Sequence, residues 1–443
     1  MNRKLLLTAI LIFTFASIIK IQPAKASDIY VPYDYDTIQE AIDAAVAGDH
    51  IYVTGTYHEH ITINKAISLI GEDEATIDGD NTGTVVTITA NGVSITYFKI
   101  FNAGSNWGTK DSGIKIESRN NCFIMYNWIN NSRIGIYLQQ CSNIRIIENT
   151  ITHNVDAVLA TYSPYTTIQA NTFQDNGLGV FLDGIETNHA LVKSNNITDG
   201  GQGIHLQYWA SNNTIINNWV MNNDYGIMLS QSQNNTIYHN NFIENTDQAW
   251  TGSNSLYNKW DIGWPTGGNH WSNHNLKDDK NGQYQNQLGS DGICDSVYTV
   301  YDSDIDKYPL AAPVNLYEVS LGFITEEVNI ISNSTITHFQ MIMAQGKMTF
   351  NVTGETGTGF CRVDIPNTIA SVWQGNYTVL VDGESPTYLR NWTQDITTYI
   401  YFKYQHSEHE VIILPELQPH LILLMLTAST LLTIIIRKRK QIT

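Results

Sequence analysis

The 443-residue sequence contains only four cysteines, too few and too scattered for a disulfide framework. Cys122 and Cys141 would lie in adjacent repeats about three residues out of step, so their spacing permits a bridge without requiring one. The sequence also lacks a CxxC motif and a His/Cys cluster at metal-ligand spacing. It therefore gives no signal for a zinc or copper centre.

Basic residues are scarce, with 24 Lys and Arg against 42 Asp and Glu, which gives a net charge of −18. Such a chain would repel nucleic acid, and no basic stripe appears in the sequence. Charged residues make up only 15% of the chain, while amide side chains are frequent. Low charge with many amides favours a sugar partner or none.

Both ends of the chain carry apolar runs. Residues 1–26 have a basic start, an apolar stretch and a small-x-small tripeptide, which together predict a cleaved signal peptide. Residues 417–436 are long and apolar enough to span a bilayer, and the basic tail 437–443 would stay in the cytoplasm. We therefore expect a cell-surface protein that is anchored in the membrane by this C-terminal helix, with the bulk of the chain extracellular.

An extracellular location fits the presence of eight glycosylation sequons. An Asn-rich chain also produces sequons by chance, and their use depends on the organism. They begin at Asn130, Asn196, Asn212, Asn234, Asn333, Asn351, Asn376 and Asn391.

One short pattern occurs six times between residues 113 and 243, with a period of 22 to 24 residues. Each copy opens with a small residue before an apolar triplet and later has an Asn two residues before another apolar residue. A period this short, with alternating apolar residues and no helical pattern, indicates one solenoid coil per repeat. The openings are GIKI at 113, GIYL at 135, AVLA at 157, GVFL at 179, GIHL at 203 and GIML at 226.

Strand alternation predicts that Ile136 and Leu138 face the interior while Tyr137 faces outward. Coils stacked about 4.8 Å apart would pair every backbone group with the coils above and below. The repeated Asn fits a turn, where it tolerates left-handed backbone angles and can bond the Asn of the next coil. We therefore predict a structural ladder at Asn127, Asn149, Asn171, Asn195, Asn218 and Asn240.

Ahead of the repeats, Ile38, Ala41, Ile42 and Ala45 recur at helical spacing, which predicts a short helix that covers the first coil. The run TIQEAIDAAVAGDHIYV, then GTYHEHITINKAISLIGE, then the Asn-laddered repeats resembles the right-handed parallel β-helix superfamily of carbohydrate-binding proteins and sugar hydrolases. Within it the sequence resembles archaeal surface proteins called NosD-like, after the accessory protein for the copper site of nitrous oxide reductase. We expect this all-β, pectate-lyase-like helix over residues 27–254.

Residues 255–312 resemble the segment that closes NosD-like helices, through Asn269, Trp271, the DGICD run and the final DKYPL. Cys294 stands where that family usually has Gly. Carboxylates in this segment could gather around calcium, which favours several oxygen ligands. The alternative is that they cap turns of the solenoid. The candidate calcium ligands are Asp291, Asp295, Asp302, Asp304 and Asp306.

Residues 313–414 change to longer alternating strands with turn signals about every ten residues, which predicts an antiparallel β-sandwich. The run TGFCRVDIPNTI followed by GNYTVLVDG resembles a module of archaeal cell-surface proteins. We interpret it as a stalk, with an independent ligand-binding domain as the alternative.

The outward residues of successive coils include Asp183 and His205, one coil apart and one strand position offset, which could act as a catalytic acid/base pair. Hydrolysis needs two carboxylates about 5–10 Å apart, whereas Glu117 and Asp183 are three coils, or about 14 Å, apart. A lone Asp/His pair is more often plain solvated surface. Four aromatic residues could stack on a sugar ring, namely Tyr137, Tyr162, Tyr208 and Trp209.

The sequence therefore favours a non-enzymatic role in carbohydrate binding, adhesion or envelope structure, with glycans or envelope proteins as partners. The first alternative is a polysaccharide lyase, hydrolase or epimerase. The second, implied only by the NosD resemblance, is copper-site maturation. Met221, Met228, His205 and His239 are candidate copper ligands, but they lack close spacing.

Overall fold

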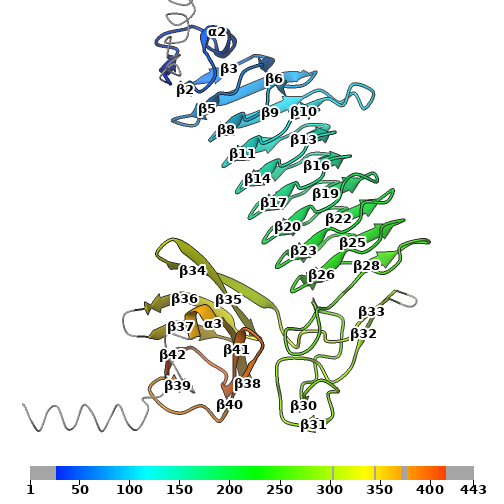
Figure 1. Cartoon of the computed structure of the whole chain (residues 1–443), viewed down its shortest axis with the longest axis vertical. Coiled ribbons are helices and arrows are strands. Elements are labelled where there is room, and N and C mark those ends of the chain that lie inside the picture. The colour runs from blue at the N-terminus through cyan, green and yellow to red at the C-terminus, as the bar shows by residue number, and fades with distance from the viewer. Residues whose placement is uncertain (1–25, 302–303, 344–345, 371–376, 416–443) are drawn as a thin grey trace, which may run out of the picture.

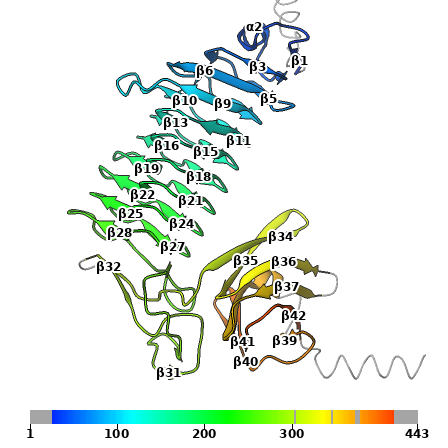
Figure 2. The ribbon, with the colours of Figure 1, turned by 180° about the vertical axis from the view of Figure 1, so that it is seen from behind.

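The computed structural model describes residues 26–301, 304–343, 346–370 and 377–415. The N-terminal part winds into a solenoid in which successive coils add strands to three parallel sheets, here called A, B and C (Figure 1). A smaller β-sandwich lies beside the far end of this solenoid (Figure 2). The predicted all-β combination of a parallel β-helix and a sandwich is confirmed.

The strands of each sheet follow one another along the solenoid axis. Sheet A consists of β1 (Asp28–Val31), β2 (His50–Val53), β5 (Ser68–Gly71), β8 (Ser94–Thr96), β11 (Phe123–Met125), β14 (Arg145–Ile147), β17 (Thr167–Gln169), β20 (Leu191–Lys193), β23 (Thr214–Ile216) and β26 (Thr236–Tyr238). Sheet B consists of β3 (Thr56–Tyr57), β6 (Thr76–Thr82), β9 (Lys99–Ala103), β12 (Trp128–Asn130), β15 (Thr150–Thr152), β18 (Thr172–Gln174), β21 (Asn196–Thr198), β24 (Trp219–Met221), β27 (Asn241–Ile243) and β29 (His270–Trp271). Sheet C consists of β4 (Ile61–Ile63), β7 (Val86–Ile88), β10 (Ser112–Glu117), β13 (Ile134–Gln139), β16 (Asp156–Thr161), β19 (Leu178–Asp183), β22 (Gln202–Gln207), β25 (Tyr225–Ser230) and β28 (Asp247–Thr251).

Equivalent residues of neighbouring coils pair in register. In sheet C, Ile136 pairs with Ile114 on one side and with Val158 on the other. All three side chains are buried in the solenoid core, as strand alternation predicts. The repeat period read from the sequence is therefore the coil of the structure.

The helix α2 (Ile38–Ala44) closes the N-terminal end of the solenoid. Its N-cap, Thr37, accepts a hydrogen bond from the backbone N–H of Glu40, whose side chain in turn accepts one from the backbone N–H of Thr37. Ile38, Ala41 and Ile42 are fully buried against the first coils. The predicted helix and its predicted apolar face are both present.

The repeated Asn residues form a buried hydrogen-bonded ladder between sheets A and B. Each side-chain amide donates to the side-chain oxygen of the next Asn, as Asn171 does to Asn195 at 3.0 Å. The same oxygen also accepts a hydrogen bond from the backbone N–H of Asn171, at 2.9 Å. The ladder runs beyond the predicted residues, because Asn240 donates to Asn269 at 2.9 Å.

We expected the left-handed backbone angles at these Asn residues, and this expectation is wrong. The left-handed position is the residue immediately before each Asn. Tyr126, Glu148 and Ala170 have φ of 59°, 54° and 55°, and they precede Asn127, Asn149 and Asn171. In these three coils the turn residue is exposed, while the Asn is buried and bonds the backbone and its neighbours. A second buried Asn ladder lies between sheets B and C and includes Asn154, Asn176, Asn223 and Asn245.

The segment after β28 closes the C-terminal end of the solenoid with aromatic side chains. Trp271 stacks between Phe242 and Tyr298, with ring centroids 4.6 and 4.3 Å away. The carboxylate of Asp306 accepts hydrogen bonds from the indole N–H of Trp271 at 2.9 Å and from the backbone N–H of Asn269 at 2.7 Å. The short strands of this segment are β30 (Lys280–Asn281), β31 (Gln287–Leu288), β32 (Tyr298–Tyr301) and β33 (Asp304–Asp306).

Two antiparallel sheets form the sandwich, together with the helix α3 (Asn367–Ala370). The first contains β34 (Val314–Leu321), β35 (Ile324–Ser332), β38 (Thr358–Pro366), β41 (Thr397–Gln405) and β40 (Tyr388–Gln394). The second contains β36 (Thr335–Ile342), β37 (Lys347–Thr353), β42 (His409–Pro415) and β39 (Tyr377–Val381).

Polar contacts join the sandwich to the solenoid and its closing segment. Asn241 and Val314 exchange two hydrogen bonds of 2.8 Å, and Lys193 forms an ion pair with Glu327. The buried Arg362 donates to the carboxylate of Asp364 and to the backbone oxygen of Asp291. These contacts hold the sandwich against the last coils.

The predicted signal peptide falls almost wholly in residues 1–25, outside the described part of the chain. The predicted membrane span 417–436 and the tail 437–443 also lie outside it. Within the described ranges, no helix has the length and apolar character needed to cross a bilayer.

Candidate functional site

The outer face of sheet C carries the residues from which the sequence predicted a site. Two rows of side chains point outward from it, and both run along the solenoid axis. The first row is Lys115, Tyr137, Leu159, Phe181, His205 and Met228. The second row is Glu117, Gln139, Thr161, Asp183, Gln207 and Ser230.

The middle of the first row is buried, which corrects the expectation of a solvated face. Tyr137 and Leu159 are 3% exposed and Phe181 is 9% exposed, and together with Ile134 they form an apolar cluster separate from the solenoid core. This part of the first row is buried because large side chains at equivalent positions stack on one another about 4.8 Å apart. Strand alternation in the sequence predicts that these side chains point outward, but it does not predict that they pack together and become buried.

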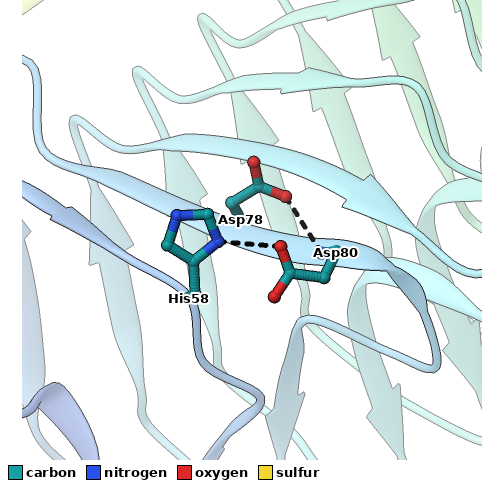
Figure 3. Close-up of side chains that lie close together, drawn as sticks. All are labelled: His58, Asp78 and Asp80. Atoms are coloured by element: carbon teal, nitrogen blue, oxygen red, sulfur yellow. Dashed lines mark hydrogen bonds and ion pairs between the residues drawn. The ribbon is translucent and has the colours of Figure 1, made fainter.

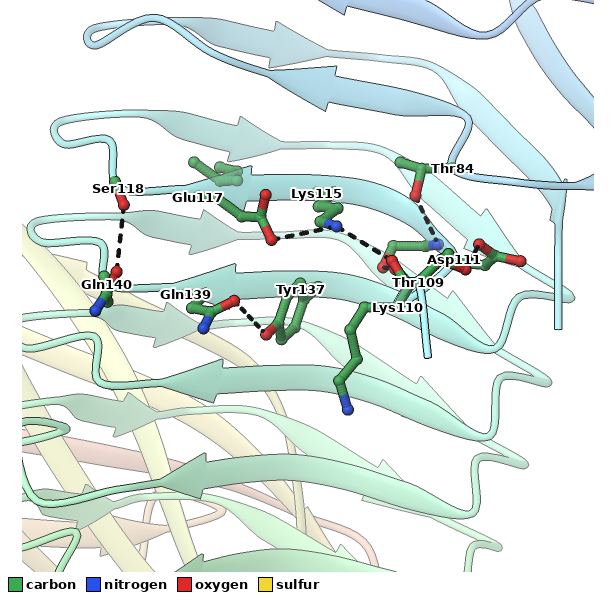
Figure 4. Close-up of polar contacts among 12 residues, drawn as sticks. Thr84, Thr109, Lys110, Asp111, Lys115, Glu117, Ser118, Tyr137, Gln139 and Gln140 are labelled. Carbon is green, nitrogen blue, oxygen red and sulfur yellow. Dashed lines mark hydrogen bonds and ion pairs between the residues drawn. The ribbon is translucent and has the colours of Figure 1, made fainter. Parts of the chain in front are cut away.

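The loop that joins β9 to β10 projects from the solenoid beside the start of β10, and we call it the Lys110 wall (Figure 1). Gly104 begins the loop where no side chain fits, since a Cβ there would lie 2.2 Å from a carboxylate oxygen of Asp111. In this loop Lys110 lies over the indole ring of Trp107. Figure 4 shows its side chain pointing along the face toward the following coils.

Ion pairs fix the surroundings of this wall. The guanidinium of Arg133 lies 4.5 Å from the centroid of the Trp107 ring and 3.6 Å from the carboxylate of Asp156. Lys115 pairs with Glu117 at 3.2 Å and donates to the backbone oxygen of Thr109. Among the described residues, the Lys110 ammonium forms no ion pair, so it is available to an anionic or hydroxyl-bearing ligand.

Aromatic side chains line the opposite end of the strands. Tyr162, Tyr208 and Trp209 follow the ends of β16 and β22, and all three have left-handed backbone angles and exposed rings. The ring of Tyr162 lies over Gly184, where a Cβ would approach it to 2.6 Å. Of the four predicted stacking residues, Tyr137 alone is buried within the face.

Burial shifts the pKa values of the groups between the two ends. It lowers the pKa of His205 to about 4, so this imidazole is neutral at pH 7, and it raises the pKa of Asp183. Burial, followed by the charges of Glu117 and Asp183, raises the pKa of Tyr137 to about 12. Burial also lowers the pKa of Lys110.

Asp183 and His205 lie on neighbouring strands but bond different partners. A carboxylate oxygen of Asp183 accepts a hydrogen bond from Gln207 at 3.3 Å, and Nε2 of His205 lies 3.4 Å from the hydroxyl of Ser230. The imidazole also stacks on Phe181. Both groups can therefore contact one ligand on the face, but they do not form a hydrogen-bonded dyad.

Three of the five predicted calcium ligands, Asp291, Asp295 and Asp306, accept hydrogen bonds from protein donors, while Asp304 lies at the start of β33. Asp291 accepts hydrogen bonds from the side chains of Trp264 and Gln285, and Asp295 accepts two from the backbone N–H groups of Asp279 and Lys280. Asp306 is saturated by the closing segment, while Asp302 lies outside the described residues. Calcium binding there stays a prediction.

The described residues contain one group of three metal-ligating side chains, which the sequence reading missed: His58, Asp78 and Asp80. Figure 3 shows Nδ1 of His58 directed at a carboxylate oxygen of Asp80, 2.8 Å away. This hydrogen bond raises the pKa of His58. The two carboxylates sit on a bulged end of β6, an irregularity that no sequence period predicts.

The candidate copper ligands fall into separate places. His205 and Met228 are paired neighbours on the outer face of sheet C, while Met221 ends a strand of sheet B and His239 is buried beside Thr266. The four cysteines are buried and free, so Cys122 and Cys141 form no bridge in this structure.

The described sequon residues divide by exposure. Asn196, Asn212, Asn234 and Asn333 are exposed, whereas Asn130, Asn351 and Asn391 are half-buried. Asn376 lies outside the described residues.

Comparison with known proteins bears on the fold. The family model described as a right-handed beta helix region matches residues 83–243. A search of curated proteins found no match.

Several solved structures resemble part of the chain. The A-module of mannuronan C-5 epimerase from Azotobacter vinelandii is 16% identical with a TM-score of 0.37, over 46% of this chain and 72% of that one. A pectate lyase is 14% identical with a TM-score of 0.38, over 54% of this chain and 81% of that one. An alginate lyase from Paenibacillus sp. is 13% identical with a TM-score of 0.37, over 53% of this chain and 98% of that one. The family match identifies the solenoid as a right-handed parallel β-helix.

Proposed function

We propose that this chain is a carbohydrate-binding β-helix protein of the cell surface, which binds a glycan along the outer face of sheet C. The cell-surface part rests on the sequence of the two termini. The binding part rests on the side chains that this face presents.

The arrangement around His205 is the observation that carries the proposal. This neutral imidazole and the carboxylate of Asp183 lie on neighbouring strands of sheet C. The loop that carries Lys110 precedes β10 at the end where the strands of this sheet begin, and the exposed rings of Tyr208 and Trp209 follow the end of β22. A sugar needs apolar surface for its ring faces and hydrogen-bonding groups for its hydroxyls, a combination that is usual in small-ligand sites. A glycan that crosses the strands would meet both.

The test is a glycan array probed with the full chain, with and without calcium, for the native protein and for His205→Ala. His189→Ala is the matched control, because His189 stacks on Tyr165 much as His205 stacks on Phe181 but lies away from the face. We expect binding that His205→Ala weakens and His189→Ala preserves. Equal binding by all three proteins would show that the outer face of sheet C is not the binding site. If no glycan binds, a role as an envelope scaffold is the better explanation.

The positions of Asp183 and His205 on neighbouring strands of the outer face favour a second candidate, an enzyme that moves a proton on a bound sugar. At neutral pH a histidine with a pKa of about 4 is a free base, and a tyrosine with a pKa of about 12 keeps its proton. Both values lie far from neutral pH, where general acid/base catalysis works best, so they describe protonation states and not catalytic power. The register keeps Glu117 and Asp183 three coils apart, too far for a hydrolase pair, which leaves a lyase or epimerase as the class of enzyme. Mass spectrometry of glycans recovered from the array would reveal cleaved or epimerised products, lost in His205→Ala.

A further inference from the structure

A concave site lies on a different corner of the solenoid, outside the turn that joins sheet A to sheet B. Its volume is about 370 Å³, and its walls include Gly71, Glu74, Tyr97, Lys99, Tyr126 and Trp128. This volume falls in the range of roughly 300–1,000 Å³ typical of small-ligand pockets. None of these residues belongs to the outer face of sheet C.

Tyr97 is the centre of this pocket. Its ring is 54% exposed and stacks on the ring of Tyr126, with centroids 5.0 Å apart and planes 5° apart. Both tyrosines have left-handed backbone angles, φ 64° and 59°, which non-glycine residues rarely adopt. The turns thus hold two large aromatic rings outward.

The strand order shows which face of Tyr97 is open. Tyr97 follows β8, which pairs on one side with β11, the strand before Tyr126, and on the other with β5, which ends at Gly71. Tyr126 covers one face of the Tyr97 ring. The pocket walls formed by Gly71 and Glu74 belong to the coil on the opposite side, so the second face of the ring borders the cavity.

Polar groups surround this aromatic platform. Glu74 pairs with Lys99 at 3.0 Å, and its carboxylate is mostly exposed. The ammonium of Lys99 lies 5.7 Å from the ring centroid of Trp128. A flat apolar ring flanked by a carboxylate and an ammonium matches a pyranose, which presents C–H groups on its faces and hydroxyls around its edge.

We infer that this corner pocket is a second saccharide site, where a neutral sugar ring stacks on Tyr97 while Glu74 and Lys99 bond its hydroxyls. The inference rests on the proposal that the ligand of this chain is a carbohydrate, and it adds a contact far from His205. An anionic sugar fits less well, because the exposed carboxylate of Glu74 would repel it.

The test is titration calorimetry of the full chain with four neutral tetrasaccharides, built of glucose, mannose, xylose and galactose units. Tyr97→Ala should weaken binding of at least one of them about tenfold, as expected for the loss of one aromatic contact. Tyr97→Phe should stay within about twofold because it keeps the ring. Glu74→Gln should weaken binding several-fold without disturbing the fold.

Tyr165→Ala is the matched control. Tyr165 is also 54% exposed, also has a left-handed backbone angle (φ 56°), and also stacks on a neighbouring coil, but it does not line the pocket. Equal affinity of Tyr97→Ala and Tyr165→Ala, or no binding of any tetrasaccharide, would overturn the inference. If His205→Ala weakens binding while Tyr97→Ala does not, the corner site is refuted and the sheet C proposal stands. The reverse result refutes the sheet C face alone.

Discussion

The imidazole of His205 stacks on the ring of Phe181, with centroids 4.9 Å apart and planes 8° apart. Phe181 belongs to the apolar cluster on the outer face of sheet C, so the stacked imidazole lies against apolar side chains. That surface is the cause of the low pKa, because burial penalises the charged form. Packing on this face therefore sets the protonation state of its most reactive group.

His205→Gln should make the protein less sensitive to acid. The pKa of His205 falls from 6.5 to about 4 on folding, so between these values the unfolded chain binds a proton that the folded chain excludes. This contribution is absent above pH 6.5 and grows as the pH falls. The free energy of unfolding of the variant, relative to the native protein, should rise by about 2 kcal/mol between pH 7 and pH 5.

Urea unfolding of both proteins at several pH values measures this difference. The two proteins must be compared because other groups also titrate in this pH range. The pKa of Asp278 is raised to about 7, so this carboxyl stabilises the folded state as the pH falls and opposes the effect of His205 in the native protein. A difference that does not change with pH would show that His205 is not buried as described.

Asn171→Ala should destabilise the solenoid more strongly than Asn217→Ala. Asn171 links Asn149 and Asn195 in the buried ladder and donates to the backbone oxygen of Ile146. Without this side chain several buried polar groups lose their hydrogen-bond partners, which lowers the free energy of unfolding by about 2–4 kcal/mol. Asn217 is also buried, but neither polar atom of its side chain has a hydrogen-bond partner among the described residues, so its replacement leaves no other polar group unpaired. The variant has only the strain of an Ala at a left-handed backbone angle, φ 57°. Urea denaturation of the two variants compares them, and equal losses would refute the ladder's role.

Much of this fold follows from the sequence because each coil repeats one register. The 22-residue steps between Asn127, Asn149 and Asn171 are the coil length, and the residues between them fall where alternation puts them. The second ladder was also readable, since Asn154 and Asn176 follow the first ladder's Asn residues at a constant interval of five.

The sites were less predictable because they depend on departures from the repeat. The loop that carries Lys110 is an insertion between coils, and its direction is set by contacts such as Arg133 with Trp107. The burial of Tyr137 had a signal, the apolar Leu159 and Phe181 at equivalent outward positions, but alternation alone reads such positions as solvent-facing. No periodic pattern marks the bulge that brings Asp80 to His58.

Arg362→Met should loosen the sandwich from the end of the solenoid. Arg362 is fully buried, pairs with Asp364 at 2.8 Å and donates to backbone oxygens of Thr266 and Asp291 outside the sandwich. The variant leaves the carboxylate of Asp364 buried without its cation, which costs about 3–5 kcal/mol. The double variant Arg362→Met with Asp364→Leu should recover much of this loss, because it removes the stranded charge. Chemical denaturation tests both, and a double variant no more stable than the single one would contradict the argument.

Gly104→Ala should displace the loop that carries Lys110 and weaken glycan binding at the outer face of sheet C. A Cβ at Gly104 would lie 2.2 Å from the Asp111 carboxylate and 2.6 Å from the backbone nitrogen of Gly83, so the loop must move. Gly108→Ala is the matched control in the same loop, because its nearest contact would be 3.2 Å, to the side chain of Asn106. Gly104→Ala should lower the affinity for an array-positive glycan at least about fivefold with little change in thermal stability, since one ordered wall of the site is lost. Unchanged affinity in Gly104→Ala would show that the loop takes no part in binding. A large loss of affinity in Gly108→Ala would show that any added methyl group in the loop disturbs the site, and not the displacement at Gly104.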